Sequence, residues 1–117
     1  EKKIYTDETL MIHIITNLIS NAFKYSKNCE DPILELSYLE TKIRIDVIDF
    51  GIGIPKDEIK KLFNSFYRAS NTATIVGSGL GLTIIKQFTK ILNGSIELES
   101  TENVKTRFTL YFPYEQK

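Results

Sequence analysis

The sequence predicts a two-layer α/β sandwich, in which a mixed β-sheet carries helices on one face. Three observations predict it. Apolar residues recur at helical spacing in long segments, apolar and polar residues alternate in short ones, and the segments follow the order β-α-β-β-α-α-β-β. A length of 117 residues suits one domain spanning 1–117. Because the chain begins with Glu1 rather than methionine, we expect it to be a piece of a longer protein.

The composition excludes several classes of protein. Fifteen basic and fifteen acidic residues cancel, so no overall charge favours binding to nucleic acid or to an anionic membrane. The single cysteine, Cys29, leaves no intrachain disulfide and no cysteine-based zinc site. No apolar run approaches the roughly 20 residues that span a bilayer, and no signal peptide is visible. These properties are typical of a soluble globular domain.

The first elements are an edge strand at residues 2–6 and a long helix that opens near Asp7. Thr6 or Asp7 suits the N-cap of this helix, which runs to about Tyr25. Its apolar residues fall in one broad arc, which is wide enough for a helix buried in a core.

A polar row occupies the other side of this helix. Asn17, Asn21 and Lys24 fall on one stripe, with His13 one turn earlier. Asparagine is a poor choice for a helix interior, because its amide competes for backbone hydrogen bonds. The row therefore indicates a face that meets something specific, although a solvated face would explain the two asparagines taken alone. For His13 we favour a polar neighbour over an acid–base residue.

Two strands follow a polar loop at 26–32. Residues 33–39 alternate imperfectly and residues 43–49 alternate well, and the short link Glu40-Thr41-Lys42 predicts a hairpin between them. Strands patterned in this way belong to a sheet with one wet face and one face covered by helices.

The middle of the chain is rich in glycine and then helical. Residues 50–55 break the strand, and Pro55 with the acids that follow it starts a helix that leads to Phe66. Residues 67–78 lack periodicity, so we expect a loop that acts as a lid.

The last third of the chain holds a helix and two strands. Gly79-Leu80-Gly81 opens an amphipathic helix that runs to Leu92 and stops at Asn93-Gly94. Strands are expected at 95–100 and 107–112, joined by a turn at 102–105.

An acidic residue and two glycines stand where the second strand of the hairpin ends, in the stretch Asp49-Phe50-Gly51-Ile52-Gly53-Ile54-Pro55. Such a carboxylate can point into a crevice, while the glycines let a flat ring approach the backbone. It would accept a hydrogen bond from the amino group of adenine and repel the oxygen at the same edge of guanine. An ordinary Asx turn is the alternative. A eukaryotic-type protein kinase is excluded despite the triplet Asp-Phe-Gly, because no His-Arg-Asp loop and no Val-Ala-Ile-Lys strand are present.

A second glycine-rich stretch, Gly77-Ser78-Gly79-Leu80-Gly81, opens the last helix. Free N–H groups and the helix dipole favour phosphate at such a position, although a flexible turn is the alternative. The spacing matches neither the dinucleotide-binding pattern nor a P-loop. Arg68 and Lys24 are candidate phosphate partners, and amide oxygens such as those of Asn17 and Asn21 suit Mg²⁺.

Together these stretches resemble the ATP-binding catalytic domain of sensor histidine kinases, in the superfamily shared with DNA gyrase, a heat-shock chaperone and mismatch-repair ATPases (the GHKL group). The resemblance runs from Asp7 to Pro113. Residues 17–26 resemble the asparagine box, 49–55 the first glycine box, 62–68 the phenylalanine box and 77–82 the second glycine box.

The resemblance implies the Bergerat ATP-binding fold, a mixed five-stranded sheet with three helices on one face. It also implies that ATP and Mg²⁺ are bound. The metal ligand would be Asn21, and the catalytic residues would be Asn17, Asn21, Lys24 and Arg68. The nucleotide-binding residues would be Asn21, Lys24, Tyr25, Asp49, Gly51, Gly53, Ile54, Phe66, Gly77, Ser78, Gly79, Leu80, Gly81 and Thr106.

The resemblance further implies a cytoplasmic phosphotransferase of two-component signal transduction. Its γ-phosphoryl acceptor would be a histidine of a dimerisation domain upstream of Glu1, in a homodimeric parent protein that is anchored to the membrane outside this segment. A response regulator receiver domain would be the indirect partner.

Two departures stand out: the family's Gly-x-Gly-Thr turn reads Asn103-Val104-Lys105-Thr106, and no dimerisation helix pair is present. A degenerate scaffold module and a GHKL-type ATPase or anti-sigma serine kinase are the alternatives.

Overall fold

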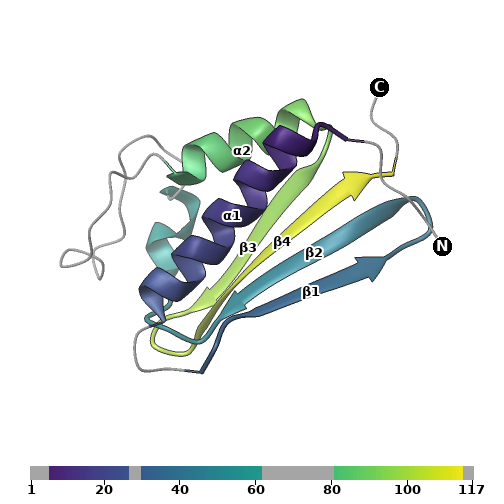
Figure 1. Cartoon of the computed structure of the whole chain (residues 1–117). Helices are drawn as coiled ribbons and strands as arrows, with labels where there is room; N and C mark the ends of the chain where they lie inside the picture. Colours follow the sequence, from purple (N-terminus) through teal and green to yellow (C-terminus); the bar gives the residue numbers. More distant parts are fainter. Residues whose placement is uncertain (1–5, 27–29, 62–80, 115–117) are drawn as a thin grey trace.

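The structure is a computed structural model that describes residues 6–26, 30–61 and 81–114. Its elements in chain order are α1 (Glu8–Tyr25), β1 (Ile33–Tyr38), β2 (Lys42–Asp49), the short 3₁₀ helix η1 (Lys56–Lys61), α2 (Gly81–Ile91), β3 (Ser95–Thr101) and β4 (Lys105–Pro113). Both α-helices lie on the same face of one sheet (Figure 1). The predicted two-layer α/β sandwich is confirmed.

The described strands form a four-stranded sheet in the order β1-β2-β4-β3. Every neighbouring pair of these strands is antiparallel. The Leu39 N–H donates to the Lys42 carbonyl at 2.9 Å and closes the predicted β1–β2 hairpin. The predicted edge strand at 2–6 lies outside the described residues except for Thr6, so the five-stranded mixed sheet stays a prediction.

The helix α1 begins and packs as its sequence predicts. Asp7 is the N-cap, and its side chain accepts a hydrogen bond from the Leu10 N–H at 3.1 Å. The buried residues Ile14, Leu18 and Ala22 follow one another at four-residue intervals and form the stripe that meets the sheet.

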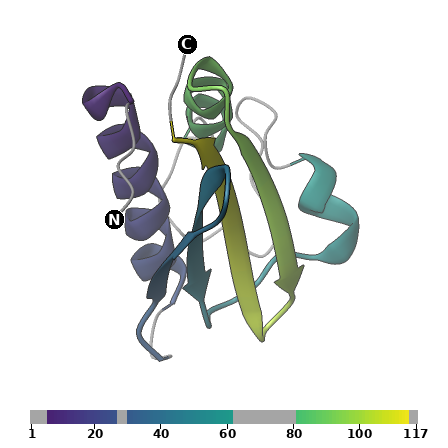
Figure 2. The same ribbon diagram turned by 90° about the vertical axis from the view of Figure 1, so that its right-hand side faces the viewer.

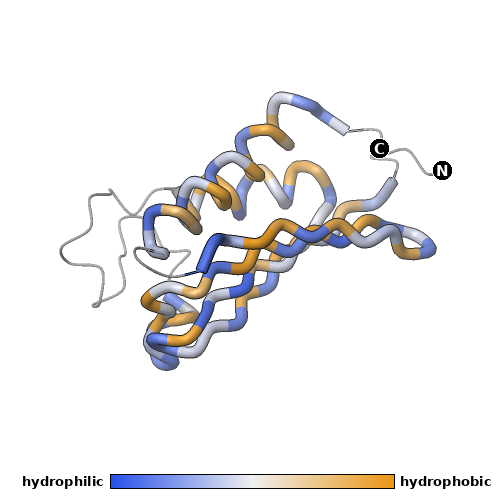
Figure 3. The backbone as a smooth tube through the Cα atoms, turned by 60° about the horizontal axis from the view of Figure 1, so that its bottom comes forward, coloured by the Kyte–Doolittle hydropathy of each residue, from blue (hydrophilic) through white to orange (hydrophobic). Residues whose placement is uncertain are grey.

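The core lies between the helices and the sheet. In the view of Figure 2, α1 and α2 cover different parts of the sheet, and α1 packs on β2 while α2 packs on β3. Hydrophobic and hydrophilic residues alternate along the strands (Figure 3), so each strand turns one apolar row toward the helices. The core residues are Ile14, Leu18, Ala22, Ile43, Ile45, Val47, Ile85, Leu92, Phe108, Leu110 and Phe112.

One position on the other face of the sheet differs from the wet face that the alternation predicts. Asp46 is on that face, yet only 2% of it is exposed. The guanidinium groups of Arg44 and Arg107 lie 2.9 and 3.1 Å from its carboxylate, and the Thr109 hydroxyl donates to it at 2.6 Å. Three polar side chains therefore cover this acid without any helix.

The two later helices agree with the predictions only in part. The predicted helix from Pro55 to Phe66 is a 3₁₀ helix over Lys56–Lys61, packed against β3, and the rest of it lies outside the described residues. The third α-helix therefore stays a prediction. The stop of α2 is confirmed, because Asn93 has a φ of 59° and the Gly94 N–H donates to the Thr89 carbonyl at 2.9 Å.

Candidate functional site

The candidate site lies where three segments meet at one end of the sandwich (Figure 1). These segments are the C-terminal end of α1, the turn that follows β2 and the turn that joins β3 to β4. Two glycines of the middle segment, Gly51 and Gly53, contact the other two segments. The structure therefore brings together stretches that are far apart in the sequence.

Asp49 is the last residue of β2 and is only 7% exposed. Its Oδ1 accepts a hydrogen bond from the Gly51 N–H at 3.1 Å. Burial raises the pKa of the Asp49 carboxyl, and this single hydrogen bond offsets only part of the rise. A buried carboxylate with so little compensation has the capacity to accept a further donor.

Gly51 fixes the turn against the end of α1. A Cβ at this position would lie 1.9 Å from the Tyr25 carbonyl oxygen, so no side chain fits. The neighbouring Ile52 N–H donates to the same carbonyl at 3.2 Å. Asp49 is thereby held beside the helix that carries the two asparagines.

Gly53 fixes the turn on its other side. Its φ is +66°, a backbone conformation that favours glycine, and a Cβ would lie 2.3 Å from the Thr101 carbonyl oxygen. The Asn103 N–H donates to the Ile52 carbonyl at 2.7 Å and ties the turn to the β3–β4 connection.

Thr106 lies directly opposite Asp49 in the register of β2 and β4. It is 4% exposed, and its hydroxyl is 2.8 Å from that of Ser100. Because Ser100 donates to the Lys105 carbonyl and accepts from the Ile54 N–H, Thr106 is the donor to Ser100. Sequence reasoning missed Ser100; the available signal was a polar residue on the side of the strand that carries Ile96 and Leu98.

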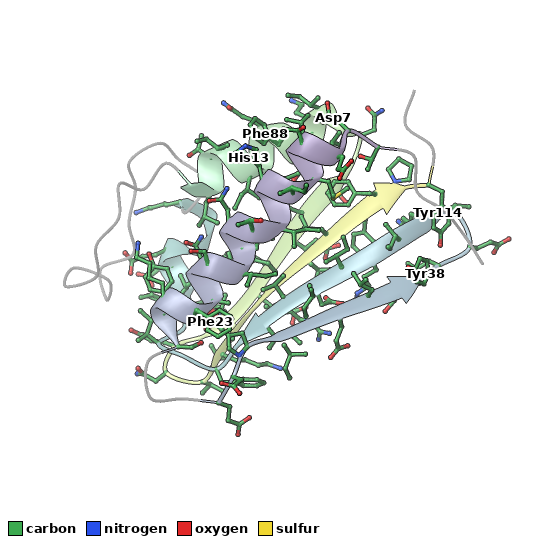
Figure 4. All side chains as sticks on the ribbon, in the orientation of Figure 1. Asp7, His13, Phe23, Tyr38, Phe88 and Tyr114 are labelled. Atoms are coloured by element: carbon green, nitrogen blue, oxygen red, sulfur yellow. The ribbon has the colours of Figure 1, made fainter. Side chains whose placement is uncertain are left out.

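The polar row of α1 is half-buried at Asn17, Asn21 and Lys24. The Asn17 side-chain amide donates to the His13 carbonyl at 2.8 Å, which leaves its oxygen for another partner. The His13 ring meets the edge of Phe88 of α2, with the ring centroids 5.9 Å apart (Figure 4).

Lys24 and Tyr25 form the last turn of α1. The ammonium of Lys24 lies 5.5 Å from the centroid of the Tyr25 ring. This contact places a cation beside the aromatic ring of Tyr25, the residue whose carbonyl meets the turn after Asp49.

A groove of about 510 Å³ adjoins the site. Of the predicted binding residues that the structure describes, only Ile54 lines it. Its lining residues are Ile54, Lys56, Ile59, Glu99, Ser100, Thr101, Glu102 and Lys105.

Several predicted site residues lie outside the described residues: Phe66, Arg68, Gly77, Ser78, Gly79 and Leu80. Gly81 is the first residue of α2. In the described ranges, no three histidine, cysteine or acidic side chains gather as a metal site. Within the same ranges, no helix is long and apolar enough to span a membrane.

Comparison with known proteins gave a family match over almost the whole chain. The model of the family described as histidine kinase-, DNA gyrase B- and HSP90-like ATPase matches residues 6–116. The chain is 39% identical over 114 residues to the sensor protein RprX of Bacteroides fragilis, covering 94% of this chain and 22% of that protein. It is 38% identical over 113 residues to the sensor-like histidine kinase SenX3 of Mycolicibacterium smegmatis, covering 95% and 29%. The chain thus spans less than a third of these relatives.

Solved structures resemble the fold closely. The mycobacterial sensor histidine kinase MprB superposes with a TM-score of 0.87 at 24% identity, covering 97% of this chain and 78% of that one, a likeness of fold. The nucleotide-free catalytic domain of the histidine kinase ThkA gives a TM-score of 0.82 at 26% identity, covering 96% and 72%.

Proposed function

The chain belongs to the family of histidine kinase-, DNA gyrase B- and HSP90-like ATPases, and from this premise we propose that it is the catalytic domain of a sensor histidine kinase. In this role it holds Mg-ATP and directs the γ-phosphoryl group to a histidine of an adjoining domain. The sensor-like histidine kinase SenX3 among its relatives supports this assignment. The observation that carries it is the buried Asp49, fixed by Gly51 against the end of the asparagine-bearing helix.

Asp49 is proposed to select the base. Its buried carboxylate has one described hydrogen-bond donor, the Gly51 N–H, and retains acceptor capacity. The amino group of adenine would donate to it, whereas the oxygen of guanine would be repelled. Thr106, opposite Asp49, and Ile54, at the end of the turn, would line the same base.

The polar row of α1 is proposed to face the phosphates. The half-buried amide of Asn21 would give its oxygen to Mg²⁺, which binds through few protein ligands and the phosphates, and Asn17 would assist. When bound, the ion neutralises charge on the triphosphate. Lys24, in the last turn of α1, would contact phosphate with its ammonium, and Tyr25 would flank the nucleotide.

Most of the remaining predicted residues lie outside the described ranges, and Gly81 is the first residue of α2. Arg68 would contact phosphates, and the backbone of Gly77–Gly81 would cradle them at the start of α2. The five-stranded mixed sheet and the third helix belong to the same proposal, as does the assignment of 1–117 to one domain.

Transfer would depend on positioning and charge stabilisation by this chain. An imidazole nitrogen of the acceptor histidine bonds to the γ-phosphorus while the bond to the ADP oxygen breaks. We place that histidine on the dimerisation domain of the same protein, a homodimer on the cytoplasmic side of the membrane. A response regulator receiver domain then takes the phosphoryl group.

The proposal is tested by measuring nucleotide binding first and phosphoryl transfer to histidine second. We expect calorimetry to detect ATP binding in the presence of Mg²⁺, with GTP at least about tenfold weaker, because a hydrogen bond to a charged group contributes about 1.5–3 kcal/mol. Absence of adenine nucleotide binding at millimolar concentration contradicts the proposal. With a separate acceptor domain and labelled ATP, the label should reach histidine; binding without such label favours the scaffold module instead.

A further inference from the structure

Each of the two buried aspartates of β2 has a threonine directly opposite it on β4. The register pairs Asp46 with Thr109 and Asp49 with Thr106. The Thr109 hydroxyl donates to the Asp46 carboxylate at 2.6 Å. Side chains opposed in this way have Cβ atoms about 4.5–5.5 Å apart, so a threonine here is within reach of the carboxylate. In the part of the chain that the structure describes, however, Asp49 accepts only from the Gly51 N–H.

The proton of the Thr106 hydroxyl is engaged by Ser100. The two hydroxyl oxygens are 2.8 Å apart, and the Ser100 oxygen is also 2.9 Å from the Lys105 carbonyl oxygen. Because a carbonyl oxygen can only accept, Ser100 donates its single proton to Lys105, and Thr106 is left as the donor to Ser100. The Ile54 N–H donates to the same Ser100 oxygen at 2.8 Å. With one bond donated and two accepted, the Ser100 hydroxyl is fully hydrogen-bonded and its orientation is fixed.

The strand order determines the direction in which the Thr106 proton points. The register places Asp49, Thr106 and Ser100 in one row across β2, β4 and β3. Because β4 lies between the other two strands, Asp49 and Ser100 are on opposite sides of Thr106. The hydrogen bond to Ser100 therefore directs the proton away from Asp49.

We propose that Ser100 is a positioning residue of the nucleotide site, which engages the Thr106 hydroxyl and so keeps the Asp49 carboxylate available to the amino group of the base. Without the Ser100 oxygen, the Thr106 hydroxyl would rotate and donate to Asp49, as Thr109 donates to Asp46. The base would then have to displace this hydrogen bond. The inference rests on the proposed function, because the ligand of Asp49 is the proposed nucleotide.

The first experiment needs no nucleotide and follows the pKa of Asp49 by NMR titration of the side-chain carboxyl carbons. Ser100→Ala should lower this pKa, because a hydroxyl that donates to the carboxylate favours its charged form. Adding Thr106→Val removes that hydroxyl and should restore the wild-type pKa. An unchanged pKa of Asp49 in Ser100→Ala overturns the proposal.

A matched pair of variants keeps Ser100 in place and so gives an answer even if Ser100→Ala fails to fold. Thr109→Val should raise the pKa of Asp46, because that carboxylate loses a hydrogen-bond donor. Thr106→Val should leave the pKa of Asp49 unchanged. A rise at Asp49 of the kind seen at Asp46 would mean that Thr106 already donates to it, and would overturn the proposal.

Calorimetry with ATP and Mg²⁺ tests the consequence for binding. We expect Ser100→Ala to weaken ATP binding about three- to tenfold, because the amino group must displace one hydrogen bond. In a Thr106→Val background, Ser100→Ala should change the affinity by less than about twofold, since the competing hydroxyl is absent. An equal loss in both backgrounds marks Ser100 as merely structural and overturns this inference alone. A wild type that binds no ATP contradicts the proposed function, whereas the NMR titrations still decide the role of Ser100.

Discussion

Two buried aspartates stand three residues apart on β2 and have opposite surroundings. Asp46 and Asp49 face opposite sides of the sheet, with exposed fractions of 2% and 7%. Asp46 accepts hydrogen bonds from Arg44, Arg107 and Thr109. The described contacts of Asp49 offer it a single backbone N–H.

The pKa values of the two carboxyl groups are shifted in opposite directions. Burial raises the pKa of Asp46, but the Thr109 hydrogen bond and the guanidinium groups of Arg44 and Arg107 outweigh it, so the pKa lies below the usual value. Burial also raises the pKa of Asp49, and there the net shift stays upward. One carboxylate is satisfied by its own protein, and the other retains capacity for a ligand. Hydrogen-bond satisfaction, more than burial, therefore distinguishes the two carboxylates.

The largest effect is expected from Asp46→Ala. The free energy of unfolding should fall by about 2–3 kcal/mol, because two guanidinium groups and a hydroxyl lose their acceptor. Urea unfolding at neutral pH measures it. Asp49→Ala is the matched control, and a loss of equal size in that variant would break the comparison.

Asp49→Ala should instead act on binding. We expect ATP affinity to fall at least tenfold, the value of a hydrogen bond to a charged group at about 1.5–3 kcal/mol. Calorimetry measures it, with folded Asp46→Ala protein as the control that keeps near-normal affinity. A similar loss of ATP affinity in both variants would contradict the division of roles.

Arg44→Ala tests how far the hydrogen-bond partners of Asp46 share its carboxylate. Arg44 is partly exposed and leaves Asp46 with two other partners, so solvent screens its contribution. Unfolding in urea should therefore show a much smaller loss of stability than that of Asp46→Ala. A loss as large as that of Asp46→Ala would mean that the three partners do not share the carboxylate.

The smallest effect is expected from pH. The lowered pKa of Asp46 adds stability that is present above its unfolded value of 3.8 and is lost as pH falls through the folded value. The raised pKa of Asp49 adds stability that is present below 3.8 and is lost as pH rises through its folded value. Relative to the wild type, Asp46→Asn should therefore lose more free energy of unfolding as pH rises from acidic to neutral, whereas Asp49→Asn should gain it. Unfolding curves recorded across this pH range measure both changes. Changes of the same sign would contradict the two pKa directions.

Local patterns predicted most of the fold because the forces involved are local. The Asp7 cap, the hairpin between β1 and β2 and the stop at Asn93 each depend on residues a few positions apart. The approach of Asp49 to the end of α1 was predicted only through the family resemblance. The roles of the individual binding residues stay predictions.

Contacts between segments far apart in the chain could not be predicted from the sequence. Alternation placed Asp46 on a wet face, whereas Arg107 and Thr109, 61 and 63 positions away, bury it. The bridging hydroxyl of Ser100 likewise depends on the packing of separate segments. Such positions reveal themselves only when partners from distant segments are placed around them.

The turn after β2 has one further consequence for hydrogen exchange. Ile52 donates its N–H to Tyr25 and accepts at its carbonyl from Asn103, so a single residue ties α1 to the β3–β4 connection. Opening of this turn releases both amide protons to solvent in one event. The amides of Ile52 and Asn103 should therefore show matched protection factors against exchange with deuterium, although they are 51 positions apart in the sequence.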